Sequence, residues 1–154
     1  MLRTVSMDNI EDQIGKEIGV TEWLPITQEQ VNQFADATLD HQFIHVDPEA
    51  AAKTPFGGPI AHGFLTLSLL SYFAANGAGV TVDGAVMGIN YGLDKVRFIQ
   101  PVAVGQRVRA RSVLLSGEEK KPGHFLFRQS VTVEIDNSDK PALVADWLTM
   151  VVTG

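Results

Sequence analysis

The fold of this chain is decided by the stretch 62–75, which reads His62-Gly63-Phe64-Leu65-Thr66-Leu67-Ser68-Leu69-Leu70-Ser71-Tyr72-Phe73-Ala74-Ala75. Its apolar residues cover nearly every side of a helix, and Asn76-Gly77 supplies a stop signal directly after it. A helix that is apolar all round is a buried helix, so we predict a long buried central helix here. The apolar run is shorter than the roughly 20 residues that span a bilayer, so no membrane span is expected.

After this helix the chain changes to short strands. Segments rich in β-branched and aromatic residues alternate with turn residues such as Gln100-Pro101 and Lys121-Pro122-Gly123. We expect strands over residues 85–93, 95–98, 106–115, 125–135 and 142–151. Links this short favour antiparallel pairing. One long apolar helix and an antiparallel sheet of about five strands that wraps it make an α+β layout, which is the hot-dog fold.

The part of the chain before the central helix is more mixed. Residues 1–21 form a charged arm in which acidic residues interrupt each apolar run, and residues 22–26 read as a short strand. Thr27 is a good N-cap, and apolar residues recur at helical spacing after it. We therefore predict an amphipathic helix from Gln28 to near Thr38.

Length, composition and charge narrow the class of protein. The chain has 154 residues, 45% hydrophobic and 19% charged, and we expect a single domain over residues 1–154 with residues 1–21 as its arm. A net charge of −6 favours neither nucleic acid nor anionic membranes as partners. The chain has no cysteine, which excludes thiolate nucleophiles and Cys-ligated zinc. The first residues do not read as a signal peptide, so we expect a cytoplasmic protein.

The densest polar cluster reads Asp40-His41-Gln42-Phe43-Ile44-His45-Val46-Asp47-Pro48. On one continuous helix Asp40 and His45 would point about 140° apart, so they can meet over one substrate only if the stretch is a loop. Turn signals across residues 39–59 favour an ordered loop, with room for one short helix over residues 48–53. From these residues alone, two interpretations are equally open. Asp40 and His45 form an acid/base pair, or Asp40 caps a turn and His45 is a structural histidine. A metal site made of His41 and His45 is weaker, because no HExxH motif is present.

The cluster resembles the signature of the MaoC-like (R)-specific enoyl-CoA hydratases, in which an Asp is followed five residues later by a His and then by Asp-Pro. The matching residues are Asp40, His45 and Asp47-Pro48. The stretch from Pro59 to Thr66 is similar to the second hallmark of that family, a His-Gly entry to the central helix.

The similarity to this family covers most of the chain after Trp23, including residues 90–105. Two departures stand out. Leu39 occupies a position where the family usually has Gly, and Gln42-Phe43 replaces Asn-Pro. These departures leave the acyl preference open.

The resemblance implies a hydro-lyase of fatty acid metabolism that reversibly hydrates trans-2-enoyl-CoA to (R)-3-hydroxyacyl-CoA. No metal or prosthetic group is expected, and CoA enters as part of the substrate. His45 would be the base that takes a proton from water, and Asp40 the acid and water-positioning partner. Gly63 would donate its backbone N–H to the enolate oxygen, because helix starts present unpaired N–H groups and glycine allows close approach.

Two further residues complete the expected substrate-binding set. Ser71 aligns with a serine of some family members, although a serine bonded to its own helix is the ordinary alternative. Asn90 stands inside an apolar strand, where a buried amide needs a hydrogen-bond partner, and we expect it to help order the site.

Several alternatives stay open at this level. The same fold hosts acyl-CoA thioesterases, and a non-catalytic acyl-CoA binding module would keep the same pocket. For His62, capping or packing at the helix start is favoured over catalysis. Arg107, Arg109 and Arg111 share one face of a strand, where a solvated surface is favoured over contact with CoA phosphates. The sheet has exposed edges, so we expect a homodimer that covers them.

Overall fold

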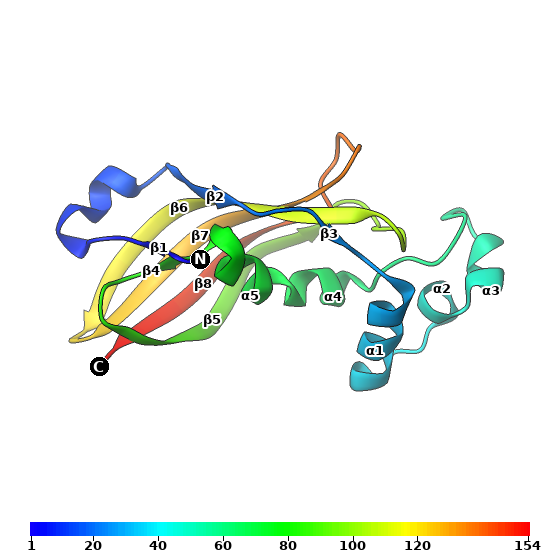
Figure 1. Cartoon of the computed structure of the whole chain (residues 1–154), viewed down its shortest axis with the longest axis horizontal. Coiled ribbons are helices and arrows are strands. Elements are labelled where there is room, and N and C mark those ends of the chain that lie inside the picture. The colour runs from blue at the N-terminus through cyan, green and yellow to red at the C-terminus, as the bar shows by residue number, and fades with distance from the viewer.

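The computed structural model describes residues 1–154 and places a broken helix against one face of an antiparallel sheet (Figure 1). The six-stranded sheet has the order β2-β6-β7-β8-β5, and β3 also pairs with β6. Its strands are β2 (Glu17–Val20), β3 (Leu24–Pro25), β5 (Ala85–Phe98), β6 (Arg107–Lys121), β7 (His124–Ile135) and β8 (Leu143–Thr153). A separate parallel pair joins β1 (Arg3–Thr4) to β4 (Val80–Thr81). The α+β hot-dog layout expected from the sequence is confirmed.

The late strands agree with their sequence patterns. Buried and half-buried residues alternate along β7 and most of β8, as they do in strands with one covered face. The core lies between this face and the helix, with Leu70 and Phe73 packed in one cluster with Val131, Ala145 and Trp147. The two strands expected over residues 85–98 are one strand, β5, because irregular pairing bends the chain there without ending the ladder.

The central helix occupies the expected place but is neither continuous nor buried all round. It consists of α4 (Gly63–Ser68), α5 (Leu70–Phe73) and a π-helical turn, η2 (Ala74–Ala78). Phe73 is fully buried, whereas Phe64 is 69% and Tyr72 47% exposed. The sheet covers one side of the helix, so the apolar residues on the other side face outward in a single chain. No helix of the structure has the length and apolar character needed to cross a membrane.

The first third of the chain matches its prediction except in the arm and the loop. Helix α1 (Gln28–Thr38) begins at Thr27, whose Oγ1 accepts a hydrogen bond from the N–H of Gln30 at 3.2 Å. Within the arm lie a 3₁₀ segment, η1 (Met7–Gln13), and the unexpected strand β2, which pairs with β6. The strand expected over residues 22–26 is reduced to β3.

Residues 39–59 hold two short helices, whereas one was expected. They are α2 (Phe43–Val46) and α3 (Pro48–Ala52). Asp47 caps α3 by accepting a hydrogen bond from the N–H of Ala50 at 2.9 Å, and Pro48 takes the first helical position. The Asp-Pro pair therefore starts a helix, and His45 is held on the turn directly before it.

Candidate active site

His45 is a buried histidine whose tautomer is set by its surroundings. Its Nδ1 lies 2.7 Å from the carbonyl oxygen of Ile60. A carbonyl can only accept a hydrogen bond, so in the neutral ring Nδ1 carries the proton and Nε2 the lone pair. The backbone carbonyl of His45 accepts a second hydrogen bond, from Nε2 of Gln28 at 2.7 Å. His45 is thus anchored at both ends with its basic nitrogen uncommitted.

Asp40 lies in the turn between α1 and α2. Leu39 adopts a left-handed backbone conformation with φ of 64° and ends α1 there. The Asp40 side chain is about half exposed, and its Oδ1 accepts a hydrogen bond from the N–H of Gln42 at 3.3 Å. Asp40 therefore lies in a loop, as predicted. His45 does not, because it lies on the short helix α2.

His62 joins these two residues. Its ring stacks on the His45 ring with centroids 3.8 Å apart, and it is 3% exposed. Its Nε2 donates to the backbone carbonyl of Asp40 at 2.9 Å, and its buried Nδ1 has no hydrogen-bond partner. One polar atom from each of Asp40, His45 and His62 lies within 4.8 Å of the others. The sequence favours capping or packing for His62 over catalysis, and the structure shows His62 packed on His45 and hydrogen-bonded to Asp40.

Two histidines and a carboxylate also form a donor set for a metal ion. A metal ligand must offer a lone pair, and because the His62 Nε2 donates to the Asp40 carbonyl, the lone pair of His62 lies on its buried Nδ1. His41, the other histidine of the weaker metal hypothesis, is exposed and its Nε2 is paired with Asp36 at 2.8 Å. The hydrogen bonds of His45 and His62 leave one ring nitrogen of each free for acid/base chemistry, and the pairing of His41 with Asp36 speaks against the pair of His41 and His45 as a metal site.

His45 and Gly63 face the same hollow, of about 380 Å³, which we call the His45 hollow. Gly63 is the first residue of α4, so its N–H lies ahead of the helical hydrogen-bond ladder. A Cβ atom at this position would lie 2.9 Å from the Phe98 ring, so the glycine permits a close approach. Thr66, one turn further along the helix, also lines the hollow and was not identified from the sequence. The hollow combines a basic nitrogen with a helix N–H.

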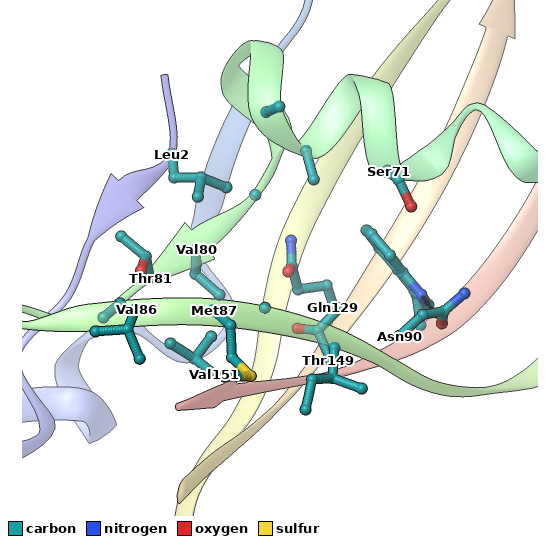
Figure 2. Close-up of a pocket in the computed structure, with 17 residues that line it drawn as sticks. Leu2, Ser71, Val80, Thr81, Val86, Met87, Asn90, Gln129, Thr149 and Val151 are labelled. Carbon is teal, nitrogen blue, oxygen red and sulfur yellow. Dashed lines mark hydrogen bonds between the residues drawn. The ribbon is translucent and has the colours of Figure 1, made fainter. Parts of the chain in front are cut away.

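Ser71 and Asn90 line a different hollow, of about 360 Å³, which we call the Gln129 hollow (Figure 2). It lies between the end of the central helix and the first half of β5. Asn90 accepts a hydrogen bond at its Oδ1 from the indole N–H of Trp147 at 2.8 Å. Asn90 therefore orders Trp147 on β8, and the structure brings neither it nor Ser71 to the His45 hollow.

The three arginines of β6 are engaged with acidic side chains. Arg107 pairs with Asp136, and Arg109 donates to Glu134 at 2.6 Å. The Arg109 guanidinium also lies over the Trp23 ring, 4.4 Å from its centroid. These contacts support the solvated-face interpretation over phosphate binding.

Arg111 completes this network by bonding both Glu134 and Glu17. The hydrogen bonds to Glu134 and Glu17 raise the pKa of Arg111. Burial alone would raise the pKa of Glu134, but hydrogen bonds from Arg109 and Arg111 outweigh it and lower that pKa. The arginine face is thus a set of mutually stabilised charges.

Comparison with known proteins adds a family match and close relatives. Residues 9–136, which include Asp40, His45 and Gly63, match the family described as MaoC like domain. The chain is 49% identical over 152 residues to Nodulation protein N of Rhizobium leguminosarum bv. viciae, covering 97% of this chain and 93% of that protein. It is 54% identical over 132 residues to 3-hydroxyacyl-thioester dehydratase Z of Mycobacterium tuberculosis (strain ATCC 25618 / H37Rv), covering 86% of each. Among solved structures, the (R)-hydratase from A. caviae involved in PHA biosynthesis has a TM-score of 0.71 at 25% identity, covering 88% of this chain and 94% of that one.

Proposed function

The chain belongs to the MaoC-like domain family, and we propose that it reversibly hydrates trans-2-enoyl-CoA to (R)-3-hydroxyacyl-CoA. The observation that carries this proposal is the hydrogen bond from His45 Nδ1 to the Ile60 carbonyl, which leaves Nε2 as a base beside Gly63. Two similar proteins are named 3-hydroxyacyl-thioester dehydratase and (R)-specific enoyl-CoA hydratase, and dehydration of a 3-hydroxyacyl thioester is the reverse of hydration of an enoyl thioester.

In the proposed mechanism His45, Gly63 and Asp40 each have one role. His45 Nε2 takes a proton from a water molecule while the water oxygen bonds to C3 of the enoyl group. The electron pair of the double bond moves towards the thioester oxygen, where the N–H of Gly63 stabilises the developing negative charge. Asp40 orients the water and relays the proton that ends on C2. Water is thereby added in full, and no metal or prosthetic group takes part.

The acyl chain would follow a groove between the central helix and β5. The His45 hollow is lined by Gly63, Phe64 and Thr66 of α4 and by Phe98 at the end of β5. A small hollow of about 150 Å³ follows, and it shares Ser71, Asn90 and Trp147 with the Gln129 hollow. Ser71 and Asn90 would therefore contact the acyl tail, at a distance from the reacting carbons.

We also propose that two copies of the chain associate through the β5 side. Strand β5 is an edge of the sheet, and its apolar residues Val86, Met87, Ile89 and Tyr91 are 46–61% exposed. An unpaired edge with exposed apolar side chains favours association with another chain. Sedimentation at micromolar concentration tests this, and a monomer there would reject it.

The central test follows the hydration of crotonyl-CoA by the loss of enoyl absorbance. Asp40→Asn and His45→Gln should each lower kcat by about 10³-fold, because each removes an acid/base group. His41→Gln is the matched control, since His41 is exposed and bonded to Asp36, and it should keep the normal rate.

The other possible outcomes of this test indicate other functions. Near-normal rates in both site variants would reject the assigned roles. Release of free thiol would identify a thioesterase. Saturable binding without any product would identify a binding module. Chiral analysis of the product decides between the (R) and (S) configurations.

A further inference from the structure

The wall of the Gln129 hollow contains a buried amide with an unused acceptor. Gln129 on β7 is 1% exposed, and its Nε2 donates to the Ala78 carbonyl at 2.8 Å and to Ser112 Oγ at 3.3 Å. Because the Ala78 carbonyl can only accept, the amide nitrogen must face it. No protein group donates to Oε1, the other atom of the amide. The hydrogen bond to Ala78 gives the side-chain nitrogen of Gln129 a partner, but the side-chain oxygen has none.

Three further side chains bring hydrogen-bonding capacity to the same hollow. The Asn90 Oδ1 is occupied by Trp147, which leaves the Nδ2 hydrogens to donate. The hydroxyls of Ser71 and Thr149 make no hydrogen bond to another protein group. Figure 2 shows Ser71 on the helix, across the hollow from Gln129, Asn90 and Thr149 on the sheet. We call Ser71, Asn90, Gln129 and Thr149 the polar strip.

The strand register explains why the sheet members of the polar strip are neighbours. Asn90 on β5 pairs with Thr149 on β8, and Gln129 on β7 pairs with Trp147, two residues before Thr149 on the same face of β8. The rest of the lining is mainly apolar, and none of its side chains is charged. The free hydrogen-bonding atoms of the strip thus lie together in a hollow that is otherwise mainly apolar, where a ligand can bond to several of them at once.

The kinds of group present favour a neutral ligand group that can both donate and accept hydrogen bonds. A carboxylate would enter without a cation to balance its charge, because no Lys, Arg or His lines the hollow. A ketone only accepts hydrogen bonds, so it would leave the Gln129 oxygen unpaired. A hydroxyl can donate to Gln129 Oε1 and accept from Asn90, Ser71 or Thr149. A hydroxyl therefore satisfies both sides of the strip.

We propose that the polar strip is a specificity subsite for acyl chains that carry a hydroxyl group far from the reacting double bond. The subsite rests on the proposed hydratase function, in which the acyl tail runs along the helix. Gly63 and Ser71 are eight residues apart, which corresponds to roughly 12 Å along a helix axis. The hydroxyl would thus lie near the end of a medium-length chain.

The test compares trans-2-decenoyl-CoA with derivatives that carry one hydroxyl, placed in turn on each carbon of the distal half. The wild-type protein should show a kcat/KM about tenfold or more higher for at least one hydroxylated substrate. Gln129→Met and Thr149→Val should each reduce this ratio severalfold. Thr149→Val is nearly isosteric, so it keeps the test decisive if Gln129→Met fails to fold. The matched control is Thr132→Val on the outer face of β7, which should leave the ratio unchanged.

Two results would overturn the subsite while leaving the hydratase function intact. One is a wild-type protein that uses the plain substrate as well as every hydroxylated one. The other is a preference that survives both Gln129→Met and Thr149→Val. If no substrate is hydrated, the proposed function fails, and calorimetry with saturated decanoyl-CoA and its hydroxylated derivatives then decides the subsite separately. Equal affinities would reject it, and tighter binding of a hydroxylated derivative would support it.

Discussion

The polar groups around His45 and the arginine face of β6 use their hydrogen-bonding capacity in opposite ways. Around His45 the groups are largely buried and sparsely partnered, with one nitrogen of His62 unpaired. On the outer face of the sheet, Arg109 and Arg111 converge on Glu134 in a half-exposed network. The groups around His45 keep lone pairs and protons available to a ligand, whereas those of the arginine face are already hydrogen-bonded to one another.

This difference separates a region suited to chemistry from one that contributes to stability. A general base needs an uncommitted lone pair, which His45 has. A half-exposed ion-pair network contributes modestly to folding and offers no free group to a substrate. Substitutions around His45 should therefore lower activity more than stability, and substitutions in the arginine network should do the reverse.

After the Asp40 and His45 variants, the largest effect on activity in this region is expected at His62. His62→Phe keeps an aromatic ring beside His45 but loses the hydrogen bond to the Asp40 carbonyl. We expect kcat for enoyl-CoA hydration to fall about 100-fold, because a small displacement of Asp40 misplaces the attacking water. KM should change little, since the acyl groove is untouched.

A second variant separates this positioning role from packing. His62→Gln places an amide N–H near the position of the lost Nε2 and should recover part of kcat. If His62→Phe keeps the wild-type kcat, or if His62→Gln stays folded but recovers none of it, His62 does not position Asp40.

The contacts that matter here differ in how far they could be predicted from the sequence. Thr27 and the helix after it follow from local capping and periodicity, and Asp40 and His45 follow from a short motif. The bond from His62 to the Asp40 carbonyl joins positions 22 residues apart and depends on tertiary folding. The outward exposure of Phe64 could not be predicted either, because composition does not show which side of a helix the sheet covers.

The next largest effect is expected in the arginine network and depends on pH. Because the folded-state pKa of Glu134 is lowered from its ordinary value of 4.5, its stabilising contribution is present above that value and is lost as the pH falls through the lower folded-state pKa. Glu134→Gln should lower the free energy of unfolding near neutral pH by about 1 kcal/mol, with hydration activity unchanged. Urea unfolding of both proteins checks this, and their stabilities should converge in acid. A constant difference at every pH would contradict the linkage to Glu134.

The smallest effect concerns Leu39, where backbone strain lies beside the proposed acid. Leu39 has a φ of 64° and is 82% exposed, so its side chain adds little packing to offset the strain. A left-handed conformation costs a non-glycine residue about 1–2 kcal/mol, whereas glycine adopts it freely. Glycine also gives the unfolded chain more freedom, which costs about 0.4–1 kcal/mol. Leu39→Gly should therefore raise the free energy of unfolding by about 0.5 kcal/mol, measured by urea denaturation with Leu39→Ala as the control that keeps the strain. A loss of stability in Leu39→Gly would show that the Leu39 side chain stabilises the turn in a way its exposure conceals.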